Sequence, residues 1–336
     1  MTVSEATTET PAASVLIVIV NYRSANLTVD CLRSLATEVA AVPGAHVVVT
    51  DNASGDGSVS ILQSAVESNG WRGWVTLMPL ERNGGFAYGN NAAIRQALAS
   101  SDPPKYVWLL NPDTIVHPGA LSTLVTFLDS RPDVGLAGSR LENPDGSAQR
   151  SWFCFPSVAG EIEGAARLRL VSKLCRKWVG TNDPPQSPCQ VDWVAGASLL
   201  VRREVFDAVG LLDEAYFMYF EEVDFCRKAF RAGWPCWYVP ESRVIHLVGQ
   251  ISGFANLNEV SSRRRPRYWF QARRYYFLKN LGAVKTLIAD LAFALAFLQF
   301  RIRYALLGRP VVESKMFLWD FVRYNLLPPT FKRPLP

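Results

Sequence analysis

The sequence has few cysteines, and its apolar runs are interrupted by charges, so it gives little indication of a disulfide framework, a zinc site or a membrane span. Its 336 residues include only six cysteines, with no CxxC pair and no zinc-ligand spacing. The apolar run at 15–20 is too short to cross a bilayer and suits a buried strand. Residues 1–13 lack a basic segment and carry Glu5 and Glu9, so we expect a flexible leader rather than a signal peptide, and reduced cytosolic thiols.

Three widespread catalytic signatures are also missing. The chain contains no GxxxxGK[ST] loop, no GxGxxG fingerprint and no GxSxG elbow. These absences argue against a P-loop site, a Rossmann dinucleotide site and a serine nucleophile.

Charge is unevenly distributed along the chain. Residues 1–246 carry 20 Lys and Arg against 26 Asp and Glu, whereas residues 247–336 carry 15 against 4. A basic tail on an acidic body indicates a polyanionic partner. Arginines and aromatic residues alternate over 263–274, which suits an anionic lipid headgroup layer better than nucleic acid. We expect the apolar helix that follows, at 286–307, to lie in the membrane plane, to pack beneath the rest of the protein or to form a homodimer.

Apolar runs and helical spacings alternate over the first 140 residues. They predict strands at 15–22, 45–52, 74–80, 105–111 and 134–138, separated by helices at 25–40, 58–69, 86–100 and 119–130. This order is typical of a doubly wound, mostly parallel α/β sheet, which binds ligands at the carboxyl ends of its strands. The later part of the chain predicts a helix at 157–178, a strand at 191–203, helices at 204–209 and 219–232, and a strand at 237–240.

Polar residues end three of the predicted strands, where a ligand site is expected. They are Asn21 with Tyr22, Asp51 with Asn52, and Asn111 with Asp113. Asp51 can accept a hydrogen bond from a nucleobase N–H, or it can cap the next helix. Asp113 can hold Mg²⁺ or Mn²⁺ against a diphosphate, or it can close an Asx turn.

Three further segments carry polar groups suited to chemistry. The glycine-rich loop at 83–91, preceded by Arg82, can bind a diphosphate or form a plain turn. An acidic cluster lies among aromatic residues. Burial there would raise the pKa of a carboxyl group and make it a usable general base. Alternatively, these acids stabilise a helix N-terminus through the helix dipole. The cluster consists of Glu221, Glu222 and Asp224. His246 follows a short strand and precedes a second glycine-rich segment, although such a histidine is more often structural.

Seven segments together resemble a known family. They are VIVNY (18–22), TDNASGDGS (50–58), RNGGFAYGNN (82–91), LLNPD (109–113), VAGASLLVRREVF (194–206), YFEEVDFCRKAFRAGW (219–234) and His246 before GQISG. In this order and at this spacing they resemble the family-two glycosyltransferases of the GT-A fold, specifically the rhamnosyltransferase-like members. The resemblance runs from about residue 14 to 255.

The resemblance implies an inverting transfer of a sugar to a hydroxyl group. The donor would be dTDP-rhamnose or a UDP-hexose, and the acceptor a glycan or lipid-linked glycan of cell-surface polysaccharide synthesis. The residues implied at the donor are Asn21, Tyr22, Asp51, Arg82, Asn83, Gly85 and Asn111, and those at the acceptor are Trp193 and Gly196. Asp113 would be the surviving acid of a DxD metal motif whose first acid is Asn111 here, with His246 completing the Mg²⁺ or Mn²⁺ shell.

The same resemblance assigns the base. Glu222 matches the second acid of the family's Glu-Asp pair, with Asp224 as a rival and Glu221 beside it. The expected segments are a leader (1–13), a nucleotide-sugar half (14–150), an acceptor half of the same domain (151–255), and a basic, apolar helical tail (256–336) on the cytoplasmic face of the cell membrane.

Two other functions remain open at this point. A sugar-phosphate nucleotidyltransferase would carry a glycine-rich loop with Lys or Arg right after the first strand, where this chain has Asn21 and Tyr22. A non-enzymatic membrane-bound scaffold rests on the basic tail alone.

Overall fold

The computed structural model describes residues 15–179, 183–247, 264–311 and 313–327. The predicted leader, Arg263 and the glycine-rich segment after His246 lie outside these ranges. The strands are β1 (Val15–Asn21), β2 (Ala45–Asp51), β3 (Val75–Pro79), β4 (Tyr106–Leu110), β5 (Thr114–Val116), β6 (Leu136–Glu142), β7 (Trp152–Phe153), β8 (Cys189–Val191), β9 (Trp193–Val194), β10 (Ser198–Arg202) and β11 (Cys236–His246).

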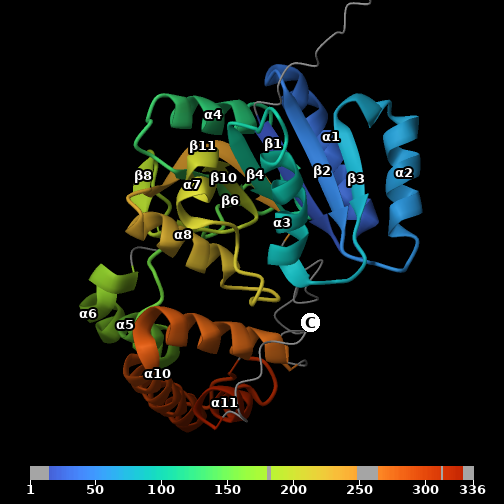
Figure 1. Cartoon of the computed structure of the whole chain (residues 1–336). Helices are drawn as coiled ribbons and strands as arrows, with labels where there is room; N and C mark the ends of the chain where they lie inside the picture. Colours follow the sequence, from blue (N-terminus) through green and yellow to red (C-terminus); the bar gives the residue numbers. More distant parts are fainter. Residues whose placement is uncertain (1–14, 180–182, 248–263, 312, 328–336) are drawn as a thin grey trace, which may run out of the picture.

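Helices connect these strands and extend the chain beyond them (Figure 1). The helices are α1 (Ala25–Ala41), α2 (Ser58–Ser68), α3 (Gly85–Leu98), α4 (Ala120–Asp129), α5 (Val158–Ala166), α6 (Arg169–Val179), α7 (Arg203–Val209), α8 (Glu221–Arg231), α10 (Arg267–Leu306) and α11 (Phe317–Phe321), with the short turns η1 (Trp71–Gly73) and η2 (Val322–Leu326).

The main sheet has nine strands in the order β3-β2-β1-β4-β10-β6-β11-β5, with β8 paired to β11. Strands β3, β2, β1 and β4 are parallel, and β6 and β11 run in the same direction, because β10 lies antiparallel between β4 and β6. The predicted α/β class with a mostly parallel sheet is therefore confirmed. The antiparallel strands β8 and β10 belong to the second half of the chain, whereas the antiparallel β5 follows β4 directly.

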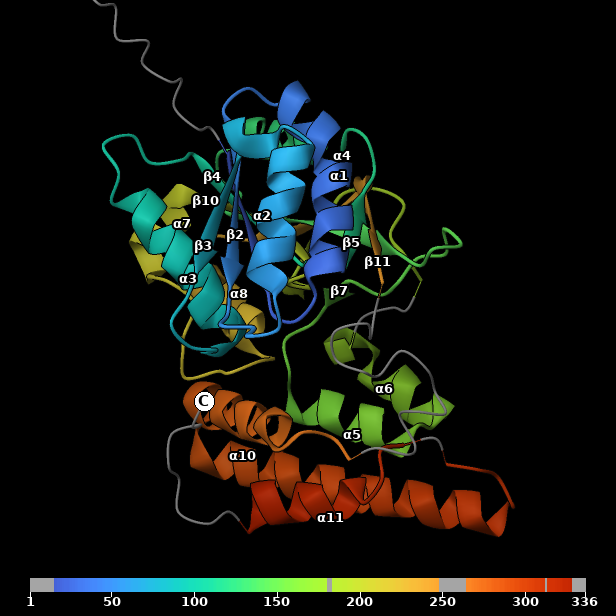
Figure 2. The same cartoon turned by 90° about the vertical axis from the view of Figure 1, so that its right-hand side faces the viewer.

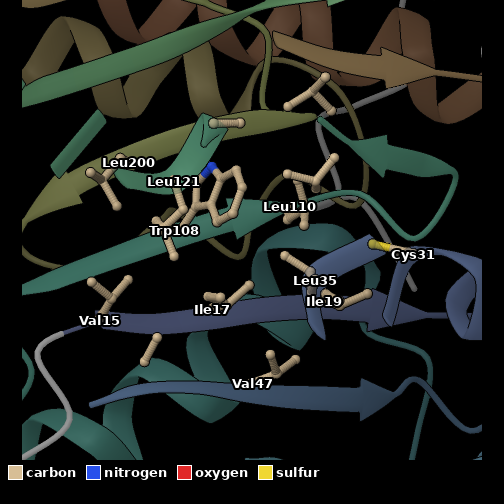
Figure 3. Close-up of a cluster of buried hydrophobic side chains, with 14 of the residues drawn as sticks. Val15, Ile17, Ile19, Cys31, Leu35, Val47, Trp108, Leu110, Leu121 and Leu200 are labelled. Atoms are coloured by element: carbon tan, nitrogen blue, oxygen red, sulfur yellow. The ribbon is translucent and has the colours of Figure 1, made fainter. Parts of the chain in front are cut away.

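Each face of the sheet packs against its own set of helices. Odd-numbered residues of β1, such as Ile17 and Ile19, pack with α1, α2 and α4, and even-numbered ones, such as Val18, with α3, α7 and α8. Figure 3 shows Ile17 and Ile19 beside Leu35 of α1 and Trp108 of β4. Because both faces are buried, β1 needs an unbroken apolar run, which explains its composition.

A layer of helices lies below the sheet domain in Figures 1 and 2. It contains α10 and α11, and also α5 and α6 from the middle of the chain. The predicted helix at 157–178 is two helices, because Arg167 adopts a left-handed conformation (φ 49°) that ends α5. The helix predicted at 286–307 begins at Arg267 and turns sharply at Gly282 (φ 79°) into two halves.

The arginines predicted at a lipid headgroup layer are instead largely engaged inside this helical layer. The Arg273 side chain is only 1% exposed and donates to Asp290 (2.6 Å) and Glu161 (2.7 Å), which joins both halves of α10 to α5. Arg264 forms an ion pair with Asp320, and Arg274 donates to the Asn325 carbonyl. Pairing with the buried carboxylate of Asp290 explains why the Arg273 side chain is buried, whereas Arg264, paired with the buried Asp320, stays half exposed.

Candidate functional site

A pocket of about 480 Å³ lies where the sheet domain meets the helical layer. Its walls come from the loops after β1, β2 and β4, from α8, from the end of β11 and from the start of α10. The polar or aromatic lining side chains are Tyr22, Asn52, Asn83, Phe86, Asn111, Asp113, Tyr219, Glu221, Glu222, His246, Arg265 and Trp269. The site thus lies at the carboxyl ends of the parallel strands, as the sequence predicted.

The ends of β1 and β2 are joined by a buried polar network. Asn21 Nδ2 donates to Asp51 Oδ1 (2.6 Å), and Ser54 Oγ donates to the same oxygen (2.6 Å). The second oxygen of Asp51 accepts from the Ser54 N–H (3.0 Å). Asn21 and Asp51 therefore fix the strand ends behind the pocket, whereas Tyr22 lines it. The proposed contact of Asp51 with the base remains a prediction.

The glycine-rich loop is held by internal hydrogen bonds. Gly85 has φ 87°, and a Cβ at this position would lie 1.8 Å from the Phe217 carbonyl oxygen, so only glycine permits this approach. The Gly85 N–H donates to Asn83 Oδ1 (3.0 Å) and the Phe86 N–H to the Phe217 carbonyl (2.9 Å). Asn83 and Gly85 line the pocket, but Arg82 stacks on Tyr88 outside the lining. The loop thus joins the donor side of the site to the segment before α8.

Asp113 and His246 come together although 133 positions separate them in the chain. Strand β5 pairs with the end of β11, and the Leu247 N–H donates to the Asp113 carbonyl (2.8 Å). This pairing places His246 Nε2 3.4 Å from Asp113 Oδ1 and 3.4 Å from Asn111 Nδ2. All three side chains line the pocket.

Asp113 and His246 offer donor atoms that suit a divalent metal ion. Asp113 Oδ1 is buried and accepts no hydrogen bond, so it keeps lone pairs free for a cation. In the part of the chain that the structure describes, no group of three His, Cys, Asp or Glu side chains could hold a metal by itself. A carboxylate and an imidazole fit Mg²⁺ or Mn²⁺ when substrate phosphates supply the remaining ligands.

The acidic pair at the start of α8 forms another wall of the pocket. Tyr219 and Phe220, both with left-handed backbones (φ 73° and 69°), make a tight turn that directs Glu221 and Glu222 into it. Such strain in non-glycine residues concentrates at functional sites. Each carboxyl has one buried oxygen without a hydrogen-bond partner. Burial raises the pKa of Glu222 to about 7; burial and the Glu222 charge raise the pKa of Glu221 well above its usual value.

Asp224, the rival base, lies outside the pocket lining. Its two oxygens accept hydrogen bonds from Lys279 Nζ (2.7 Å) and Asn280 Nδ2 (2.9 Å) of α10. The side chain is 1% exposed. Asp224 therefore joins α8 to the helical layer, and its position favours Glu222 as the base.

The two residues implied at the acceptor have different surroundings. Gly196 lines the pocket, and a Cβ there would touch the Glu222 side chain at 3.4 Å. Trp193 stacks on Phe153 (4.2 Å between ring centroids) and donates to the Cys154 carbonyl (3.0 Å) away from the lining.

Sequence reasoning gave no site role to some of the lining residues. Asn52 was expected at a strand end but was assigned no contact, and its Nδ2 donates to the Gly85 carbonyl (2.9 Å). Arg265 and Trp269 were interpreted as lipid-facing, but they line the pocket, with the guanidinium 4.4 Å from the indole ring centroid. Their place in the lining depends on how the start of α10 packs against the sheet domain, which local patterns do not encode.

The raised pKa of Glu221 predicts a pH-dependent effect on stability. The fold favours the protonated carboxyl, so its stabilising contribution is full below the unfolded pKa of about 4.5 and is lost as pH rises through the higher folded pKa. Glu221→Gln should therefore raise Tm by about 2 °C or more at about pH 8, and by less at about pH 5. Thermal unfolding followed by circular dichroism measures both values. The exposed Glu81→Gln is the control; a lower Tm for Glu221→Gln at the higher pH would contradict this account.

Comparison with known proteins identifies a family. The model of "Glycosyltransferase like family 2" matches residues 11–274. The chain is 32% identical over 254 residues to the N-acetylglucosaminyl-diphospho-decaprenol L-rhamnosyltransferase of Mycobacterium tuberculosis, covering 72% of this chain and 78% of that protein. It is 28% identical over 166 residues to rhamnosyltransferase WbbL of Escherichia coli, covering 48% of this chain and 60% of the relative.

Solved structures show the fold. The mannosyltransferase PcManGT of Pyrobaculum calidifontis, solved with GDP-Man and Mn²⁺, superposes with a TM-score of 0.56 at 16% identity, covering 88% of this chain and 75% of that one. The family match excludes the nucleotidyltransferase and scaffold alternatives and confirms the resemblance in the sequence. This chain belongs to the family-two glycosyltransferases, with the GT-A fold and with rhamnosyltransferases among its relatives.

Proposed function

We propose that the enzyme transfers a rhamnosyl or hexosyl group from a dTDP- or UDP-sugar to a hydroxyl of a lipid-linked glycan, with inversion at the anomeric carbon. The proposal rests on one observation: the Glu222 carboxyl group, with one oxygen that has no hydrogen-bond partner, lines the same pocket as Asp113 and His246. The relative named for N-acetylglucosaminyl-diphospho-decaprenol supports a lipid-linked acceptor, and both named relatives support rhamnose.

In the proposed reaction, Glu222 accepts the proton of the acceptor hydroxyl while that oxygen attacks the anomeric carbon. The bond from this carbon to the donor phosphate breaks, and the nucleoside diphosphate leaves with the electron pair. One displacement inverts the carbon and needs no covalent nucleophile. A pKa of about 7 makes ionised Glu222 a stronger base than an ordinary glutamate.

On the opposite side of the reacting carbon, Asp113 and His246 would hold the metal. A bound Mg²⁺ or Mn²⁺ would neutralise the charge that develops on the departing diphosphate. Asn111, 3.4 Å from His246 Nε2, orients the imidazole toward Asp113.

The function is tested with a panel of dTDP-, UDP- and GDP-sugars and a lipid-linked glycan acceptor. Nucleotide release identifies the donor, release in excess EDTA tests the metal, and NMR of the anomeric proton gives the configuration of the product. A retained configuration would overturn the single displacement. Absence of transfer from every dTDP- and UDP-sugar would overturn the donor class.

Donor choice is expected to favour uridine or thymidine nucleotides. Asp51 Oδ2 accepts only the Ser54 N–H among the described hydrogen bonds, so it can also accept from the N3–H that both pyrimidines carry. Asp51→Asn should weaken UDP or dTDP binding about 10-fold or more, and it preserves the shape of the network better than alanine. Calorimetric titration measures this. Equal affinity for GDP, unaffected by the substitution, would disprove the assignment.

A further inference from the structure

The second half of α10, after Gly282, carries an unpartnered apolar stripe. Its exposed side chains are Val284, Leu287, Ile288, Leu291, Leu295, Leu298, Ile302 and Leu306. Leu295 is 66% exposed and Val284 74%. A helix turns about 100° per residue, so these positions fall within an arc of roughly 100° on one face.

The opposite face of the same helix is packed against the protein. Phe293 stacks on Phe321 (4.4 Å between ring centroids), Phe297 and Phe300 are 1% exposed, and Asp290 binds Arg273. By length and composition, Arg267–Leu306 could cross a membrane, and most of its apolar surface is not buried in the protein. Since a spanning helix would have to leave these partners and expose Asp290 to lipid, the packing favours a helix that lies in the membrane plane.

The exposed charges of the segment that carries the stripe have one sign. Among the described residues 283–327, the exposed charged side chains are Lys285, Arg301, Arg309, Lys315 and Arg323. The acidic side chains of this segment are buried or paired: Asp290 and Asp320 are buried, and Glu313 forms an ion pair with Arg167. An anionic surface is therefore complementary to this face, whereas a second copy would bring the same positive charges together across a twofold axis.

Helix α6, in the same helical layer, has the same character. Leu170, Leu174 and Trp178 recur every four residues and are more than half exposed, with Lys173 and Lys177 beside them. None of the α6 side chains is buried. Basic, amphipathic helices of this kind bind in the headgroup region of anionic membranes.

We propose that the apolar stripe of α10 (284–306) inserts into the interface of an anionic lipid bilayer, flanked by its basic residues. The stripe and its flanking basic residues, rather than the arginines of 263–274, would then bind the lipid. Arg265 and Trp269 at the start of α10 line the pocket, so the bound helical layer would place the site beside the membrane. This last consequence rests on the proposed transfer to a lipid-linked acceptor; the lipid binding does not.

Flotation of the full chain with vesicles tests the proposal. The wild type should float with phosphatidylcholine vesicles that contain phosphatidylglycerol, and less with pure phosphatidylcholine or at high salt. The triple variant Leu291→Gln/Leu295→Gln/Leu298→Gln should lower partitioning by at least ~10-fold, because three leucines lose their burial in lipid. Ile61→Gln on α2, an exposed isoleucine of the sheet domain, should float as the wild type does.

Each other outcome points away from a bilayer. Lack of flotation by the wild type at low salt, or full flotation of the triple variant, would overturn the proposal. A dimer by light scattering that the triple variant dissociates, without vesicle binding, would assign the stripe to a second copy. Donor-dependent nucleotide release in detergent-free solution is measured on the same samples; its retention in the triple variant separates lipid binding from the proposed function.

Discussion

Glu222→Gln is expected to lower the rate of transfer by about 100- to 10,000-fold while donor binding stays nearly unchanged. Glutamine fills the same space beside Gly196 but cannot accept a proton from the acceptor hydroxyl. Single-turnover kinetics with saturating acceptor measures the chemical step, and titration with the nucleoside diphosphate measures binding.

The pH dependence supplies an independent readout. Because Glu222 acts as a base only when ionised, the wild-type rate should rise with pH and level off above about 7. The glutamine variant should lose this dependence. Glu221→Gln and Asp224→Asn are the matched controls: an inactive control beside an active Glu222→Gln would show that the base had been assigned to the wrong acid.

Asp113→Asn should lose nearly all turnover, on the order of 1,000-fold or more, because several kcal/mol of charge stabilisation depends on the metal. The amide is a weaker ligand than the carboxylate and leaves the diphosphate charge uncompensated. Turnover with UDP- or dTDP-sugar is measured over a range of Mn²⁺ concentrations.

Metal binding is also measured without turnover. Mn²⁺ together with the nucleoside diphosphate should raise the Tm of the wild type, and of the exposed control Asp145→Asn, but not that of Asp113→Asn. Full activity in Asp113→Asn, or in the wild type with excess EDTA, would exclude a catalytic metal at this position.

Local pattern located the parallel strands of the first half of the chain and the edge of the sheet where the pocket lies, but the strand predicted at 191–203 is divided into β8, β9 and β10. The unbroken apolar run of β1 predicts burial on both faces, and the polar residues at the strand ends predict a site there, where Tyr22, Asn111 and Asp113 line the pocket. The two-residue period of apolar side chains in a strand and the 3.6-residue period in a helix depend only on neighbours in the chain. They can therefore be read without knowing how distant segments pack. The ends of helices were predicted less accurately. The break between α5 and α6 is caused by the left-handed backbone of Arg167, which the periodicity of side chains does not indicate.

The tertiary structure alone decided how distant residues act together. The pairing of β5 with β11 brings His246 to Asp113. The ion pair with Lys279 holds the Asp224 carboxylate against α10, outside the pocket that Glu222 lines. The sequence by itself determined an α/β fold, the resemblance to the family-two glycosyltransferases and a basic C-terminal segment. Only the tertiary structure decided which charges face inward and which apolar side chains face outward: Arg273 compensates the buried Asp290, and the proposal of lipid binding therefore rests on the exposed apolar stripe of α10. The physical reason is that burial and pairing of a charge depend on packing between segments, which no local spacing specifies.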